Sequence, residues 1–129
     1  MKKILLLAVL MLGVSYAVHA ADAVISGAQV TYSYKEPSTN ADGSPLADLK
    51  TITIYYTVNG GATVKAKDEA ASAKTGGGAK SSTFTVPIVD SNESTLRFWS
   101  TATDESGNES VASAVTVKRI DKLAPSSPE

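Results

Sequence analysis

The sequence contains no cysteine and a single histidine, His19, in 129 residues. A chain without cysteine forms no disulfide and offers no thiolate, which excludes disulfide scaffolds, cysteine-ligated zinc and thiol nucleophiles. The one histidine falls among the first twenty residues, which differ in character from everything that follows. The functional classes open to this protein therefore depend on what becomes of that first segment.

Residues 1–20 have the three parts of a secretory signal peptide. Two lysines form a basic start, residues 4–14 form an apolar run, and small residues end the segment at Ala20. We expect cleavage after Ala20, with Ala17 as the alternative. The apolar run is shorter than the roughly 20 residues that a membrane span needs, and no later stretch approaches that length. The sequence therefore predicts a secreted, periplasmic or cell-surface protein without a membrane span.

Cleavage after Ala20 removes the only histidine, so the mature chain has neither His nor Cys. This excludes Ser-His-Asp and Cys-His catalysis, zinc held by either residue type, and haem held through them. The net charge changes from −1 to −3 because two lysines are lost. No basic stripe remains for a phosphate backbone, which argues against nucleic-acid binding. We expect a protein that is not an enzyme and that carries no cofactor.

Polar and apolar residues alternate along several short stretches, as they do in half-buried strands. Asn59-Gly60 predicts a type I′ hairpin turn, because both central positions of that turn need positive φ. Pro87 marks a strand end or an edge position. With no convincing amphipathic helix, the pattern predicts an antiparallel β-sandwich over residues 21–119. The expected strands are residues 29–34, 51–58, 62–67, 82–88, 95–103 and 111–118.

Two stretches lack this alternation. Residues 68–81 are mainly Ala, Lys, Ser and Gly, and three consecutive glycines from Gly76 forbid a stable helix, so we expect a mobile loop. Residues 120–129 contain Pro125 and Pro128 and should form a disordered tail or tether.

Two motifs resemble those of bacterial or phage-type fibronectin type III domains. Residues 34–49 contain an aromatic residue, prolines and an Asn-x-Asp-Gly-x-x-Leu turn before the Tyr-rich strand at 52–56, similar to the family's passage from strand B to strand C. Residues 98–110 are similar to its strand F and F–G turn. The resemblance covers roughly residues 23–119. It implies a seven-stranded immunoglobulin-like sandwich with sheets ABE and C′CFG, used as a spacer or binding module.

The chain departs from this family at two positions. Tyr34 stands where the family usually has Trp, and Leu96 stands where it has a corner tyrosine. Without the tyrosine hydroxyl, we expect packing of Ile88 and Val89 against Leu96 to hold the connection between strands E and F.

Trp99 and Tyr55 are the candidate ligand-binding residues, because they take outward positions on strands expected to be neighbours. Paired exposed rings can bind a sugar or a protein partner. The alternative is an ordinary cross-strand pair, worth up to about 1 kcal/mol and covered by the stems of Arg97 or Lys65. We expect a non-catalytic protein-interaction or structural module at a cell or virion surface, with an unknown partner. The alternative function is a carbohydrate-binding module that uses this pair on a polysaccharide.

Oxygen-bearing side chains crowd the turn at residues 104–109, at a density that could hold Ca²⁺ weakly. Their spacing matches no EF-hand loop, so we interpret the segment as a solvated hairpin turn. The same interpretation applies to Asn40, Asp42 and Asp48. We therefore expect no metal site.

Overall fold

The computed structural model describes residues 25–89 and 92–129, so the expected signal peptide lies outside the described residues. This part of the chain forms strands and no helix, and accordingly has no helix long and apolar enough to cross a membrane. All strand pairs are antiparallel, which confirms the expected all-β antiparallel fold. The strands are β1 (Ile25–Lys35), β2 (Leu49–Val58), β3 (Val64–Ala70), β4 (Ala79–Val89), β5 (Glu93–Asp104) and β6 (Thr116–Asp121).

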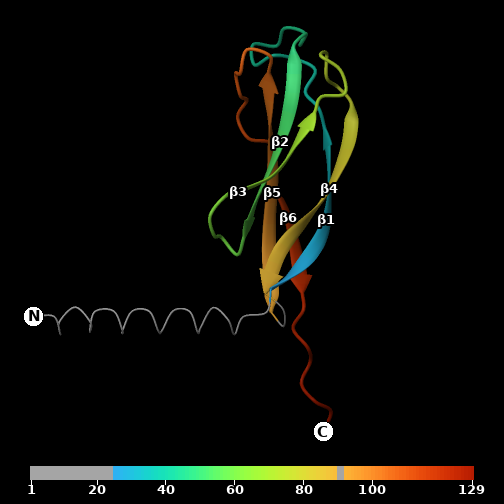
Figure 1. Ribbon diagram of the computed structural model, residues 1–129, viewed down its shortest axis with the longest axis vertical. Coiled ribbons are helices and arrows are strands. Elements are labelled where there is room, and N and C mark those ends of the chain that lie inside the picture. Colours follow the sequence, from blue (N-terminus) through green and yellow to red (C-terminus); the bar gives the residue numbers. More distant parts are fainter. Residues whose placement is uncertain (1–24, 90–91) are drawn as a thin grey trace, which may run out of the picture.

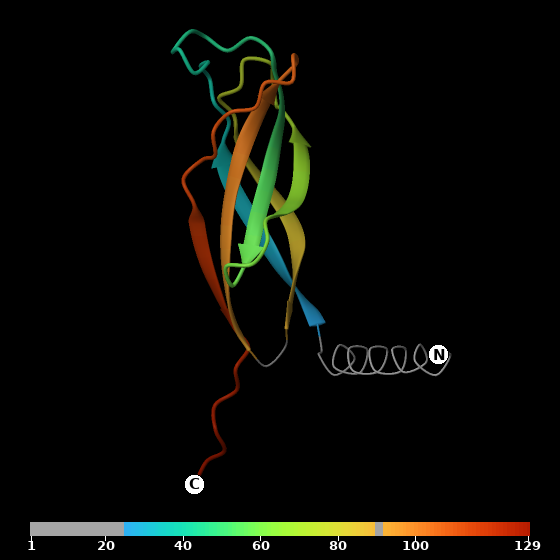
Figure 2. The same cartoon turned by 90° about the vertical axis from the view of Figure 1, so that its left-hand side faces the viewer.

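The strands belong to two sheets that enclose the main core cluster (Figures 1 and 2), and a smaller buried cluster consists of Leu46, Leu49 and Ile52. One sheet has the order β3-β2-β5-β6, and the other pairs β1 with β4. Seven strands were expected, and within the described ranges six are present.

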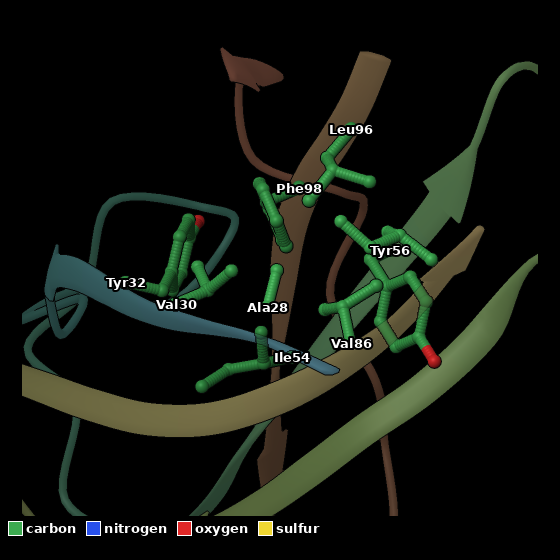
Figure 3. Packing of buried hydrophobic residues seen from close by; sticks show 9 residues of the cluster. Ala28, Val30, Tyr32, Ile54, Tyr56, Val86, Leu96 and Phe98 are labelled. Carbon is green, nitrogen blue, oxygen red and sulfur yellow. The ribbon is translucent and has the colours of Figure 1, made fainter. Parts of the chain in front are cut away.

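The alternation of apolar residues builds the core, because it turns one face of each strand toward the opposite sheet (Figure 3). Phe98 lies at its centre, 5.9–6.3 Å between ring centroids from Tyr32, Tyr56 and Phe84. Burial of each large apolar side chain contributes about 1.5–3 kcal/mol. The cluster consists of Ala28, Val30, Tyr32, Ile54, Tyr56, Val86, Ile88, Leu96 and Phe98.

Ile88 near the end of β4 and Leu96 near the start of β5 are both buried. Leu96 is 0% exposed and Ile88 is 2% exposed, and both belong to the core cluster. Both residues therefore lie in the same core cluster, while the side chain of Val89 lies outside the described residues.

The Asn59-Gly60 turn has the predicted geometry. The two residues have φ values of 51° and 72°, and the backbone N–H of Gly61 donates to the carbonyl of Val58 at 2.9 Å. These values confirm the type I′ hairpin between β2 and β3. The second strand begins two residues later than expected, at Val64, which is the cross-strand partner of Tyr56.

The loop expected at residues 68–81 is shorter in the structure and is fastened by hydrogen bonds. β3 extends to Ala70 and β4 begins at Ala79, which leaves a connection of eight residues, 71–78. The buried carboxylate of Glu36 fastens this connection, since it accepts hydrogen bonds from the Ser72 hydroxyl and, at 2.8 Å, from the Ser72 backbone N–H. At Gly76 the chain passes so close to the Pro37 carbonyl that a Cβ would overlap it. Glycine permits a close approach here rather than mobility.

The expected strand at residues 111–118 is also misplaced, because β6 spans Thr116–Asp121. Val111, Val115 and Val117 are 90%, 50% and 54% exposed, so they do not face the core. The segment before β6 is irregular because the Ser113 hydroxyl accepts the hydrogen bond of the Ser100 N–H, in place of a strand carbonyl.

The first two residues of the expected tail, 120 and 121, belong to a strand instead. Ile120 and Asp121 belong to β6, and Ile120 is half-buried against the core. Residues 122–129 have no regular structure and extend away from the sheets (Figures 1 and 2). The body of the protein therefore ends at residue 121 instead of 119.

Candidate functional site

The outward side of the sheet β3-β2-β5-β6, here called the outer face, carries the predicted aromatic pair. Tyr55 on β2 and Trp99 on β5 are direct cross-strand partners. Their ring centroids are 6.1 Å apart and their planes differ by 20°. The structure thus brings together the two residues that the sequence placed on neighbouring strands.

The geometry of the pair limits what the rings can offer to a ligand. Nearly parallel rings at this separation form an offset stack, in which each ring covers part of one face of the other. Both side chains are half-buried. At most one face of each ring is therefore available, and the pair is not a flat platform of two rings side by side.

Threonines surround the aromatic pair, a feature that the sequence analysis missed. Thr53 lies opposite Thr101 across β2 and β5, and Thr51 lies opposite Thr103. The signal in the sequence was the row of threonines at alternate positions of both strands. Thr53 and Thr101 are buried although they point away from the core, because acidic side chains cover them.

Glu109, from the turn between β5 and β6, is the first of these acidic side chains. Its Oε1 accepts hydrogen bonds from the Thr101 hydroxyl at 2.6 Å and from the Tyr55 hydroxyl at 3.2 Å. One carboxylate oxygen thereby joins the turn to both strands of the aromatic pair. The position of Tyr55 is consequently fixed by the turn as well as by the sheet.

Asp68, on β3, covers the other side of the outer face. Its carboxylate accepts hydrogen bonds from Lys65 Nζ at 2.8 Å and from the Thr53 hydroxyl at 2.7 Å. The Lys65 bond and the Thr53 bond hold the pKa of Asp68 below its ordinary value, and the Asp68 carboxylate raises the pKa of Lys65. Both groups are charged at neutral pH, so the rim of the aromatic pair carries a fixed ion pair.

A shallow, open hollow of about 420 Å³ lies on this part of the outer face. Tyr55 lines the hollow together with charged residues of both signs. The basic residues are Lys50 and Lys65, and the acidic ones are Asp68, Asp104, Glu105 and Glu109. A surface of this kind suits the mixed charges of another macromolecule better than a small molecule that needs an enclosed site.

The turn at residues 104–109 is organised by its own donors. Asp104 accepts hydrogen bonds from the backbone N–H of Asn108 at 2.8 Å and from its side-chain amide at 2.9 Å. The Asn108 side-chain bond, followed by the backbone bond, lowers the pKa of Asp104. Among the described residues no cluster of acidic side chains has the arrangement of a metal site.

Comparisons of the chain with protein-family models, with curated proteins and with solved structures find no match. Because a two-sheet β fold hosts many unrelated activities, its architecture does not assign one. The function is therefore argued from the residues of the outer face.

Proposed function

We propose that the protein is a non-catalytic, exported β-sandwich that binds a protein partner through the outer face, as an interaction or structural module at a cell or virion surface. The observation that carries this proposal is the Tyr55–Trp99 stack, in which Tyr55 also lines an open hollow of mixed charge. Trp and Tyr are among the residues that contribute most to protein–protein binding, typically inside a polar rim. The export step rests on the signal-like residues 1–20.

The electrostatics of the face favour binding over acid–base chemistry. A carboxyl group that acts as a general acid needs a raised pKa, whereas the pKa values of Asp68 and Asp104 are lowered by their hydrogen-bond donors. Glu109 is already bonded to two hydroxyl groups. These groups are arranged to hold the surface in shape.

The strand order supports a fibronectin type III-like assignment. The order β3-β2-β5-β6 corresponds to strands C′CFG, and the β1–β4 pair corresponds to strands B and E. Buried Leu96 takes the place of the corner tyrosine. Domains of this kind commonly present one sheet or one set of loops to a partner.

A carbohydrate-binding module is the second candidate, favoured by the hydroxyl and carboxylate groups of Thr103, Asp68 and Glu109 beside Tyr55 in the hollow. The mutual stacking of the rings counts against it, because a sugar would meet a single ring face. A glycan array separates the two functions. Reproducible sugar binding that disappears in Trp99→Ala would replace the protein-partner proposal.

Site-specific photo-crosslinking tests the proposed function. A photoreactive residue at Arg97, which is exposed and two positions from Trp99, should give a discrete crosslinked product with one partner on intact source cells or virions. The matched control is the same residue at Thr85, an exposed position on the opposite sheet. Equal product at both positions, or a product at Arg97 that persists in Trp99→Ala, would refute the proposal.

A further inference from the structure

β1 has one hydrogen-bonded neighbour in the part of the chain that the structure describes, and that neighbour is β4. The ladder continues past the strand, where the Glu36 N–H donates to the Gly78 carbonyl at 2.8 Å. Because bonded pairs alternate along an antiparallel ladder, the N–H and C=O groups of Gln29, Thr31 and Ser33 point away from β4. These groups form an open edge.

Two of the other sheet edges carry the charges that prevent pairing with another chain. The edge strand β3 contains Lys65, Lys67, Asp68 and Glu69. The edge strand β6 contains Lys118, Arg119 and Asp121.

The edge of β4 is protected in a different way. Pro87 cannot donate to a ladder. In addition, Lys80 Nζ donates to the Ala70 carbonyl at 2.8 Å and the Ser82 hydroxyl donates to Glu69 at 2.6 Å, so β3 covers part of this edge.

The edge of β1 lacks these protective features over residues 25–34. Residues 25–34 contain neither a charged residue nor a proline, and the strand extends over 11 residues. A long, neutral and regular edge is the kind that pairs with another strand. The contrast with β3, β4 and β6 indicates that the edge of β1 is kept open for pairing.

We infer that β1 pairs antiparallel with β1 of a second copy of this chain, about a two-fold axis at Thr31. In this register Thr31 faces Thr31 of the second copy, and Gln29 faces Ser33. Lys35, the only charged residue of the strand, faces Gly27, so no like charges meet. The sequence of β1 is therefore complementary to itself in the register that uses the whole edge.

This pairing gives a closed dimer. Each copy contributes the open, uncharged edge of β1, and among the described strands the two-fold contact leaves no such edge for a third copy. The two β1–β4 pairs merge into one four-stranded sheet with the order β4-β1-β1-β4. The outer face belongs to the other sheet of each copy. The test of the dimer is therefore independent of the test of partner binding.

Light scattering after size-exclusion chromatography tests the dimer. The purified protein should have twice the monomer mass at high micromolar concentration. Thr31→Lys should be a monomer that still unfolds cooperatively, because two lysines would then meet at the axis. Thr83→Lys is the matched control: Thr83 is exposed, lies beside Thr31 on β4 and loses the same Thr31–Thr83 hydroxyl contact, yet it is one strand away from the edge. It should remain a dimer.

A cysteine variant locates the contact. Because the chain has no cysteine, Thr31→Cys should oxidise to a single disulfide-linked dimer, since opposed residues of a bonded pair lie about 5.5 Å apart between Cα atoms, within disulfide reach. Thr83→Cys should stay monomeric on a denaturing gel. The inference is overturned if the wild-type protein is a monomer at millimolar concentration, if Thr31→Lys still dimerises, or if Thr83→Cys crosslinks as fast as Thr31→Cys.

Discussion

At the scale of single residues, Glu36 links β1 to a connection far along the chain. Its side chain is 2% exposed, and its two carboxylate oxygens accept the N–H and O–H of Ser72. Burial raises the pKa of Glu36, but the bonds from Ser72 outweigh that effect, and the pKa lies below its ordinary value. The buried carboxylate is therefore charged and fully bonded at neutral pH.

Replacement of this carboxylate should destabilise the protein. Glu36→Gln keeps the shape but turns an amide group toward a donor, so we expect the free energy of unfolding to fall by about 1–3 kcal/mol. Urea denaturation measures the change. Glu129→Gln, the same substitution in the exposed tail, should leave the free energy of unfolding unchanged. Equal stability of the two variants would show that Glu36 does not hold residues 71–78.

Substitution of Gly76 and of Gly77 distinguishes the cost of a left-handed backbone from the cost of a steric overlap. Both have positive φ, 61° and 84°, but only at Gly76 would a Cβ overlap the Pro37 carbonyl. Gly77→Ala should cost about 1–2 kcal/mol for the left-handed backbone. Gly76→Ala should lower the free energy of unfolding by clearly more in the same urea experiment. If the two substitutions cost the same, the close passage beside Pro37 is not a constraint.

At the scale of elements, the connection formed by residues 71–78 should resist a protease. The carbonyl of Lys74 accepts a hydrogen bond from the Leu49 N–H at 2.9 Å, and its ammonium pairs with Glu105 at 2.7 Å. Brief digestion of the native protein with trypsin should therefore leave the bond after Lys74 intact, whereas the same digestion in urea should cut it, as read by mass spectrometry. Cleavage after Lys74 in the native protein would mean that the connection opens locally.

The elements also show which parts of the fold the sequence could predict. β1, β2, β4 and β5 are expected within about four residues of their observed ends, because alternation along each strand is enough to choose its buried face. Residues 71–78 and the start of β6 were misjudged because their conformation depends on side chains distant in sequence, such as Glu36, or on serine hydroxyls that replace backbone partners.

The candidate site was predictable to the same degree. Strand alternation placed Tyr55 and Trp99 outward on neighbouring strands, and register made them partners. Nothing local indicates that Glu109 bonds to Tyr55, 54 positions away, or that Asp68 covers Thr53. The contacts that form the rim of the hollow join residues distant in sequence, so they could not be predicted from the sequence.

At the scale of the whole molecule, the lowered carboxyl pKa values predict acid sensitivity. Glu69 joins Glu36 and Asp68 in this group, because bonds from Ser82 and Lys67 lower its pKa. A carboxyl whose folded pKa is below its unfolded pKa stabilises the fold above the unfolded value, about 4, and this contribution is lost as the pH falls through the folded value. The melting temperature should be nearly constant from about pH 7 to 5 and should fall below that range. A constant melting temperature down to pH 3 would contradict the prediction.

The central claim is that the outer face binds the partner, and the most direct test is a binding isotherm of the purified protein on intact source cells or virions. The double variant Tyr55→Ala with Trp99→Ala is compared with Thr83→Ala with Thr85→Ala, two exposed positions on the opposite sheet. Wild type and the threonine variant should bind saturably with equal affinity. The aromatic variant should bind at least about tenfold more weakly, as expected when interface residues with large contributions are removed. Equal affinity of all three proteins would contradict the claim.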